Sequence, residues 1–468
     1  MAIVGVTFAI PISIAIYCGE PEVLLSFIIP MILSFVFFLS VYIPFRKVKF
    51  RLSIRQTFAI VALCWITASF MGAMPLYFSG TFPSFTDAFF ESVSGFTTTG
   101  CSVCPSVEDL PRSINMWRCL THWLGGMGIV TLTVALLPLL GIGGFQLIKA
   151  ETTGPEKGKV TARITTTAKI LWLIYASLTL IEAILLRICG MDIIDAFAHA
   201  FSTLGTGGFS SRNASIGAWD SPAIDYVITI FMLLSGVNFS LFYYLIARKV
   251  SDIFSNSEFR YYIGIVICSV TIVVLCLIPY FNNFGDSFRY GIFQVASIVT
   301  TTGFGTNDYI LWPSSAQFIL FLLFFIGGSS GSTSGGIKVI RWVVLGKQVH
   351  NETEKMLHPH GVFSIRLDGR PGRKDIVFNV AAFLMLYIAL LMITTFIGTF
   401  GKLDIFTSFT AAASMVGNIG PAFGSLGPTE SFSVLPNFLK WWYCFAMLAG
   451  RLELYTMLIF FFPSYWKK

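Results

Sequence analysis

The sequence predicts an all-α polytopic membrane protein, with four fused membrane–pore loop–membrane repeats like those of a potassium channel, preceded by two extra transmembrane helices. Three observations support this fold class. The chain of 468 residues is 55% hydrophobic and 12% charged, whereas a soluble domain carries about a quarter charged residues. Apolar runs near the length of about 20 residues that crosses a bilayer follow one another along the chain. A short motif recurs four times between these runs.

The recurring motif has the frame of a serine, five residues and a glycine. Its copies are Ser94–Gly100, Ser202–Gly208, Ser297–Gly303 and Ser414–Gly420, and their glycines are 108, 95 and 117 residues apart. Similar signals at such a period indicate one unit copied four times. Four copies in one chain can surround a single axis, so one polypeptide could build a pore. One such loop alone would be interpreted as an ordinary turn; four in one frame favour the pore.

Residues 1–55 are predicted to hold two leading spans, 2–18 and 23–45, and a basic loop. The first run could be mistaken for a signal peptide. It lacks the basic n-region of such a peptide, so we interpret it as a mature spanning helix.

Each repeat is predicted to contain a span, a short helix, a filter loop and a second span. In repeat 1 (56–145) these lie at 56–78, 84–96, 97–100 and 114–140; in repeat 2 (146–255) at 168–190, 192–204, 205–208 and 221–248. In repeat 3 (256–350) they lie at 259–281, 286–299, 300–303 and 315–346; in repeat 4 (351–468) at 376–400, 404–415, 416–420 and 436–462. The short helices cannot cross a bilayer. Irregular backbone at membrane depth must be buried in protein or line a water-filled cavity, which favours a re-entrant pore helix and filter.

Charge distribution predicts the orientation. With the N-terminus in the cytoplasm, 23 of the 31 Lys and Arg residues fall on the cytoplasmic side, as the positive-inside rule requires. The filter loops then lie near the outer side, where acidic loops would raise the local cation concentration. This distribution also argues against nucleic-acid binding as the reason for the net charge of +7.

The residue types of the filter loops suit a monovalent cation. Backbone carbonyls replace the hydration shell of such an ion without a fixed charge, so the ion can leave again. Glycine permits the backbone angles that aim successive carbonyls at one axis. Threonine adds a hydroxyl oxygen, and the C-terminal end of the short helix is partially negative.

A glycine-rich segment, residues 327–336, interrupts the second span of repeat 3. Its five glycines are Gly327, Gly328, Gly331, Gly335 and Gly336. Each glycine costs a helix roughly 1 kcal/mol relative to alanine. We therefore expect a flexible intramembrane gating loop below the filter. The alternative is close packing of small residues between helices; a phosphate-binding loop is excluded because GK[ST] is absent.

Charged residues inside spans are functional candidates by default. Arg451 and Glu453 lie in the last span, and we expect Arg451 either to project beneath the filter or to pair with Glu453 or Glu182. We expect Lys338 and Arg341 to couple the gating loop to the cytoplasmic side. Arg118 and His122, at the start of the 114–140 span, are expected to be structural, packing its extracellular end.

Catalytic and metal signatures are absent from the sequence. Cys101 and Cys104 form one CxxC motif, but no second CxxC or nearby histidine completes a zinc site. The five histidines form no HExxH, and no GxSxG occurs. We therefore expect a protein that is not an enzyme. No GxGxxG is present either, so a regulatory nucleotide would have to bind another subunit.

The chain resembles the TrkH/KtrB-type potassium-uptake proteins over essentially its whole length. The motifs that carry this resemblance are Thr97–Ser102, His122–Gly128, Thr206–Ser210, Thr300–Gly305 and Gly417–Pro421. It implies a filter that holds potassium at Thr98, Thr99 and Gly100, at Thr206, Gly207 and Gly208, at Thr301, Thr302 and Gly303, and at Asn418, Ile419 and Gly420. In related plant transporters a serine at the first filter glycine accompanies sodium transport; here all four positions are glycine. The fourth loop, with Asn418 and Pro421, departs most from the potassium-channel signature.

The resemblance also implies the setting of the pore. It implies a gating loop and an arginine near the pore, a homodimer, and a multi-pass protein of the bacterial cytoplasmic membrane surrounded by lipid. A cytoplasmic ring of nucleotide-binding TrkA-type subunits would dock on the basic stretches 149–169 and 338–374. A proton- or sodium-coupled potassium symporter remains the alternative, because such transporters also use broken helices. It would need an ionisable residue beside the ion path, and only Arg451, Glu453 and Glu182 qualify.

Overall fold

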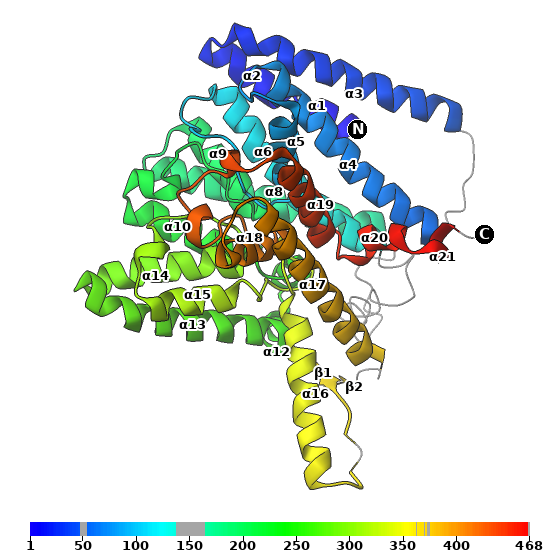
Figure 1. Ribbon diagram of the computed structural model, residues 1–468, viewed down its shortest axis with the longest axis vertical. Helices are drawn as coiled ribbons and strands as arrows, with labels where there is room; N and C mark the ends of the chain where they lie inside the picture. Colours follow the sequence, from blue (N-terminus) through cyan, green and yellow to red (C-terminus); the bar gives the residue numbers. More distant parts are fainter. Residues whose placement is uncertain (47–53, 137–163, 362, 369, 372–374, 467–468) are drawn as a thin grey trace.

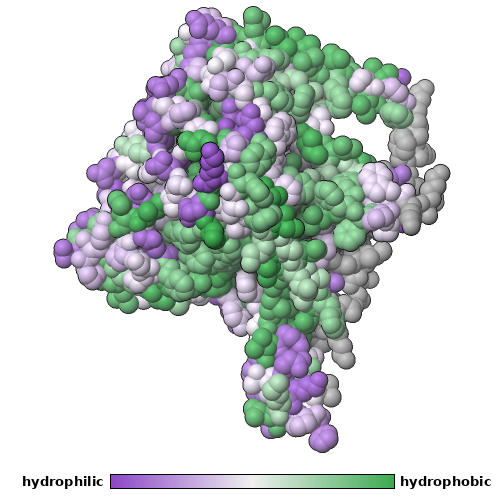
Figure 2. All heavy atoms as spheres, viewed as in Figure 1, coloured by the Kyte–Doolittle hydropathy of each residue, from purple (hydrophilic) through white to green (hydrophobic). Residues whose placement is uncertain are grey.

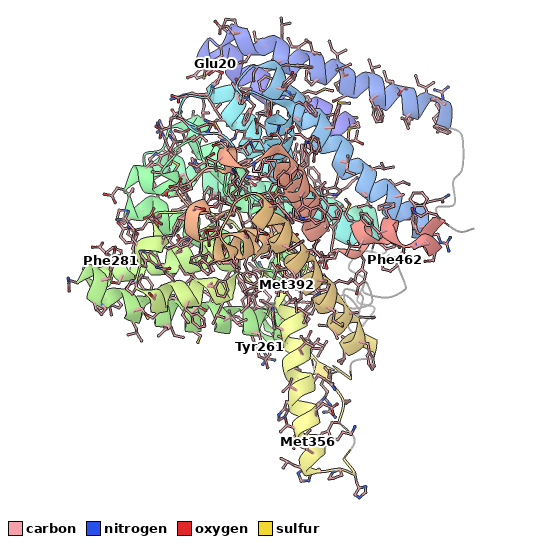
Figure 3. The ribbon with its side chains drawn as sticks, viewed as in Figure 1. Glu20, Tyr261, Phe281, Met356, Met392 and Phe462 are labelled. Atoms are coloured by element: carbon pink, nitrogen blue, oxygen red, sulfur yellow. The ribbon has the colours of Figure 1, made fainter. Side chains whose placement is uncertain are left out.

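The computed structural model describes residues 1–46, 54–136, 164–361, 363–368, 370–371 and 375–466. The end of the predicted 114–140 span, and most of the basic stretch 149–169, lie outside the described residues. The helices form one body, from which α16 (Val339–Leu357) projects together with the two-stranded hairpin of β1 (Arg366–Leu367) and β2 (Arg370–Pro371) (Figure 1). Met356, 82% exposed, lies near the tip of this projection (Figure 3).

The leading unit consists of α1 (Ala2–Thr7), α2 (Ala9–Cys18) and α3 (Leu24–Phe45). The predicted 2–18 helix is interrupted at Phe8, where Pro11 cannot donate a backbone hydrogen bond to the preceding turn. Glu20, at the top of Figure 3, fixes this unit to the body, because its carboxylate accepts from the backbone N–H groups of Arg112 (2.8 Å) and Ser113 (3.2 Å) at the start of α6 (Arg112–Leu136). A carboxylate is favourable at a helix N-terminus.

The four pore helices are α5 (Phe85–Phe96), α9 (Ile193–Gly205), α14 (Phe284–Val299) and α18 (Ile405–Gly417). Their ends differ from the predicted ones by two residues at most. Each begins at a side chain that accepts from a backbone N–H of the first turn, which is the usual N-cap arrangement. The caps are Ser84, Asp192, Asn283 and Asp404.

The first span of every repeat is a long apolar helix. These helices are α4 (Ile54–Phe78), α8 (Ile164–Ile188), α13 (Ser257–Phe281) and α17 (Asp375–Phe400). Within the described residues, five helices are long and apolar enough to cross a membrane: these four and α3. Large side chains such as Phe378 and Met385, each 74% exposed, cover their outer faces. Figure 2 shows hydrophobic residues over much of this face of the molecule and hydrophilic ones at its left edge and at the tip of the α16 projection.

The second spans are less regular than predicted. The continuous 221–248 span is wrong, because α10 (Pro222–Ser235) and α11 (Phe239–Ile246) meet at an angle of 96°. The chain turns at Gly236–Asn238, and the Asn238 side chain then caps α11 by accepting from Ser240 N–H (2.9 Å). The short helix α12 (Val250–Ser255) follows.

The predicted interruption of the 315–346 span is confirmed, because α15 (Ser314–Leu323) ends before the glycine-rich segment and helix resumes only at α16. The predicted span 436–462 is wrong as a single helix. In repeat 4, α19 (Asn437–Arg451) ends where Glu453 and Leu454 take positive φ, and α20 (Tyr455–Leu458) and α21 (Pro463–Trp466) follow. The 3₁₀ helices are Pro21–Val23, Ser215–Trp219, Tyr309–Leu311, Gly424–Leu426, Phe432–Val434 and Ile459–Phe461.

Candidate ion filter and gate

All four filter loops have the same backbone conformation. The residue two positions before each final glycine is left-handed, with φ of 53° at Thr98, 55° at Thr206, 54° at Thr301 and 53° at Asn418. The glycines also have positive φ: 84° at Gly100, 82° at Gly208, 83° at Gly303 and 106° at Gly420. The residue between them donates its N–H to the carbonyl of the frame serine: Thr99 to Ser94 (2.9 Å), Gly207 to Ser202 (2.8 Å), Thr302 to Ser297 (2.8 Å) and Ile419 to Ser414 (3.0 Å). This bond explains the spacing of the sequence motif.

The four glycines lie against one another's loops in cyclic order. A Cβ atom added to Gly100 would lie 1.9 Å from the carbonyl oxygen of Gly207. A Cβ atom added in the same way would lie 2.1 Å from Thr302 O at Gly208, 2.4 Å from Ile419 O at Gly303 and 2.7 Å from Thr99 O at Gly420. The order runs from loop 1 through loops 2, 3 and 4 and back to loop 1. The structure thus brings the predicted filter residues together into one closed ring.

One side of this ring opens into a cavity of about 130 Å³. All four filter glycines line it, and Cys101, Cys104, Arg118 and Glu430 lie among its other lining residues. We call this the cavity side of the filter. Cys101 and Cys104 are free thiols, and no group of three His, Cys, Asp or Glu side chains in the described ranges could hold a metal ion.

The opposite side carries side-chain oxygens. Thr98 Oγ1 and Asn418 Oδ1 are buried and accept no hydrogen bond from any described residue. The amide nitrogen of Asn418 donates to Thr99 Oγ1 (2.9 Å) and to the Met447 carbonyl (3.0 Å), which fixes the direction of its oxygen. Buried polar atoms are nearly always paired in native proteins. Two buried oxygens without a described partner are therefore candidates for binding a cation.

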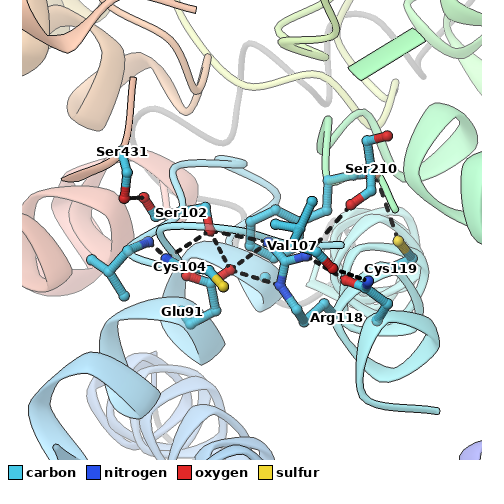
Figure 4. A network of polar contacts seen from close by, with 12 residues as sticks. Glu91, Ser102, Cys104, Val107, Arg118, Cys119, Ser210 and Ser431 are labelled. Atoms are coloured by element: carbon cyan, nitrogen blue, oxygen red, sulfur yellow. Dashed lines mark hydrogen bonds and ion pairs between the residues drawn. The ribbon is translucent and has the colours of Figure 1, made fainter. Parts of the chain in front are cut away.

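A buried ion pair braces the cavity side (Figure 4). Glu91, on pore helix α5, pairs with Arg118, on α6, with 2.6 Å between Oε1 and Nη2, and both side chains are almost fully buried. The Glu91 carboxylate also accepts from Ser102 Oγ (2.9 Å) and Val103 N–H (2.9 Å), just after the first filter loop. The Arg118 guanidinium lies 4.3 Å from the centre of the Phe209 ring, next to Gly208. The expected structural role of Arg118 is confirmed.

His122 connects pore helix α5 to the residue that follows filter loop 2. Its Nε2 accepts from the backbone N–H of Phe209 (3.2 Å), so Nδ1 carries the proton and donates to the Gly95 carbonyl (2.8 Å). The side chain is fully buried. It too has the structural role that we expected.

The glycine-rich segment lies on the side of the ring away from the cavity. Gly335 N–H donates to Thr301 Oγ1 (2.6 Å), and a Cβ atom at Gly335 would lie 2.4 Å from the Gly417 carbonyl oxygen. The segment also contacts the break between α10 and α11, where Ser329 N–H donates to the Gly236 carbonyl (2.8 Å). The predicted gating loop therefore touches repeats 2, 3 and 4 below the filter.

Arg451 contacts this loop directly. Its Nη1 donates to the Thr333 carbonyl (2.7 Å). The alternative, an ion pair with Glu453 or Glu182, is wrong: Glu453 pairs with Arg341, and neither Glu182 oxygen has a hydrogen-bond partner among the described residues. The guanidinium is buried beside the loop, so it places a positive charge near the filter.

Glu258, at the start of α13, is a candidate that the sequence analysis missed. One carboxylate oxygen, Oε1, accepts from Ser330 N–H (2.6 Å) and Ile340 N–H (3.2 Å), so it connects the gating loop to the first turn of α16. The side chain is 4% exposed. The Lys338 ammonium group also holds the loop, because it donates to the Ser334 carbonyl. The predicted first span of repeat 3 begins at residue 259, so Glu258 fell just before it.

The fold and this site define a class: helical membrane proteins in which four fused repeats arrange four glycine loops around one axis. The sequence profile of the TrkH family, described as cation transport protein, matches residues 25–468. The chain belongs to the TrkH family. This family is one of transport proteins, not a class of enzymes.

Individual relatives agree with this assignment. The chain is 41% identical to the Trk system potassium uptake protein TrkH of Escherichia coli (strain K12), over 91% of this chain and 89% of that protein. It is 37% identical to the TrkH of Vibrio parahaemolyticus, over 100% of this chain and 97% of the relative. The crystal structure of the potassium transporter TrkH from Vibrio parahaemolyticus superposes with a TM-score of 0.90 at 34% sequence identity, covering 100% of this chain and 97% of that one.

Proposed function

We propose that this chain takes up potassium through one central pore, with the four filter loops as its selective segment. The observation that carries the proposal is the closed ring in which each filter glycine lies against a carbonyl oxygen of the next loop. Closely spaced carbonyl oxygens are the ligands that replace the hydration shell of potassium. The names of the TrkH relatives, which describe potassium uptake, support the choice of ion.

The residues proposed to hold the ion are Thr98–Gly100, Thr206–Gly208, Thr301–Gly303 and Asn418–Gly420. The unpaired oxygens of Thr98 and Asn418 support a cation at the end of the filter that faces the gating loop. Thr206, by contrast, donates its hydroxyl to the Gly205 carbonyl (2.6 Å). The loops thus share a backbone frame while their side chains differ.

The glycine-rich segment is proposed to be the gate. It contacts the filter region at Thr301 and Gly417. Arg451 holds the loop and adds a positive charge that opposes cation entry. A cytoplasmic TrkA-type nucleotide-binding subunit is proposed to open the gate by acting on the basic stretch 338–374, which includes the projecting α16.

The orientation, the membrane and the oligomeric state are proposed from the distribution of charged residues and from the family. The N-terminus is placed in the cytoplasm of a bacterium, and the cavity side of the filter faces outward. A homodimer in the cytoplasmic membrane is proposed from the family alone.

Potassium uptake by bacterial cells that lack their own uptake systems tests the function. Cells that express the chain together with a TrkA-type subunit should accumulate potassium from dilute medium, and cells with the empty vector should not. Uptake that follows only the membrane potential supports a channel. Uptake that requires a proton or sodium gradient would establish the coupled symporter instead.

A further inference from the structure

The carbonyl group of Gly420 differs from those of the other three filter glycines. Its oxygen accepts from the Cys101 thiol (2.8 Å between Sγ and O) and from the Ser414 hydroxyl (2.7 Å). A carbonyl oxygen has two lone pairs, so these two donors occupy its usual acceptor capacity. Both donors are buried, Cys101 at 2% and Ser414 at 0% exposure.

The equivalent groups of the other loops lack this arrangement. Among the described residues, no side chain donates to the carbonyl oxygens of Gly100, Gly208 or Gly303. The serine that matches Ser414 in repeat 3, Ser297, donates instead to the carbonyl of Phe304 (2.7 Å), one residue beyond the filter glycine. The serine of repeat 1, Ser94, has a buried hydroxyl without a described partner.

We propose that Cys101 and Ser414 are specificity-determining positioning residues, which withhold the Gly420 carbonyl from the ion. The level of the filter next to the cavity then offers three backbone carbonyls to a cation instead of four. The number of coordinating carbonyl dipoles is one of the factors that separate potassium from sodium. This level therefore separates potassium from sodium less well than a ring of four carbonyls would. Most of the selectivity then depends on the carbonyls of Thr99, Gly207, Thr302 and Ile419.

The inference rests on the proposed function, and its test is the ratio of potassium to sodium flux in proteoliposomes. Cys101→Ala and Ser414→Ala each free one lone pair of the Gly420 carbonyl, and the double variant frees both. The double variant is expected to raise the potassium-to-sodium flux ratio by about threefold or more, the effect of gaining one interaction of hydrogen-bond strength. Cys101→Ser, which keeps a donor at the same position, is expected to retain the wild-type ratio.

Ser94→Ala is the matched control, because it removes a hydroxyl at the equivalent place of repeat 1 that donates to no filter carbonyl. An unchanged or lowered ratio in the double variant would overturn the inference. If that variant does not fold, Ser414→Ala alone decides, since it removes one oxygen atom from a helix end. The wild type is measured first: absence of potassium flux there would refute the proposed function, whereas normal flux with unaltered ratios in the variants refutes only this inference.

Discussion

The filter loops and the gating loop are both glycine-rich, non-helical segments at the middle of the molecule, but they are held in different ways. Each filter loop is closed by a backbone bond to a serine of its own pore helix, five residues earlier. The gating loop is closed at its base, where Gly327 N–H donates to the Ile337 carbonyl (2.9 Å) and Val339 N–H to the Gly328 carbonyl (3.2 Å). Unlike the filter loops, it is also held by charged side chains of distant helices, Glu258 on α13 and Arg451 on α19.

This difference matches the two proposed tasks. A filter must keep its carbonyls in place to discriminate between ions, and local backbone bonds together with cyclic packing achieve that. A gate must move, and segments that move come from the regions with the least local stability. Charged side chains on separate helices can release the gating loop when those helices shift. The following substitutions test the comparison.

The largest effect is expected from Gly303→Ala in the filter. Gly303 has φ of 83°, and an added Cβ atom would lie 2.4 Å from the Ile419 carbonyl oxygen. The left-handed conformation costs a non-glycine residue roughly 1–2 kcal/mol before this clash is counted. Potassium uptake should fall below about a tenth of the wild-type rate.

Gly305→Ala is the control for that substitution, because an added Cβ atom there meets nothing within 4 Å. It should leave uptake close to the wild-type rate. Equal losses in the two variants would show that the ring does not constrain Gly303 as described.

A gain of flux is expected from Arg451→Gln at the gate. The change removes the positive charge below the filter and weakens the bond to Thr333. Relief of a barrier of about 1.4 kcal/mol corresponds to about tenfold in rate. Basal potassium flux in proteoliposomes without a regulatory subunit should rise accordingly, and Arg451→Lys, which keeps the charge, should show a smaller rise. A lowered flux in Arg451→Gln would contradict the gating role.

A smaller gain is expected from Glu258→Ala. Loss of the carboxylate leaves the N–H groups of Ser330 and Ile340 without their acceptor, at roughly 1–3 kcal/mol for each buried group. Basal flux should rise about threefold and the thermal unfolding temperature should fall. Glu258→Gln keeps an Oε1 acceptor and should lie close to the wild type in both measurements. If Glu258→Ala and Glu258→Gln change both measurements equally, the residue acts through its negative charge and not by anchoring the loop.

The smallest effect is expected from the N-cap of α18. Hydrogen bonds from Thr407 hold the pKa of the Asp404 carboxyl below its usual value. The carboxylate therefore stabilises the folded state above its unfolded pKa, and this contribution is lost as the pH falls through the lower folded pKa. Asp404→Ala should lower stability by about 1 kcal/mol at neutral pH.

The pH dependence of that loss checks its origin. Thermal unfolding at neutral pH should separate Asp404→Ala from the wild type, and the separation should shrink as the pH falls below about 4. Asp404→Asn, which retains a capping oxygen, should show less of the loss. If the unfolding temperatures of Asp404→Ala and the wild type differ as much at low pH as at neutral pH, the capping account is contradicted.

The sequence predicted the pore helices closely because their signal is local. The frame from Ser94 to Gly100 reflects one backbone bond and one glycine conformation, and both belong to the same short segment. The breaks in the second spans have a different origin. The bend at Gly236 and the end of α19 after Arg451 coincide with contacts to the gating loop of repeat 3, which is far away in the sequence.

Long-range contacts also explain which functional candidates were missed. Glu258 acts on residues 72 and 82 positions away, and the Cys101 thiol meets a carbonyl 319 positions away. A CxxC motif directs attention to metal or redox chemistry, whereas here the thiol is a hydrogen-bond donor in the filter. Only the closure of the four repeats around one axis brings these groups together.

The most direct test of the account is the reversal potential of purified protein in a planar bilayer, with potassium on one side and sodium on the other. Because the four filter loops form one closed ring of carbonyls, currents of the wild type and of Arg451→Gln should reverse near the potassium equilibrium potential. Currents that reverse near zero would contradict the assignment of the ring as a potassium filter. Absence of current in both proteins, with uptake only under a proton or sodium gradient, would contradict the pore itself.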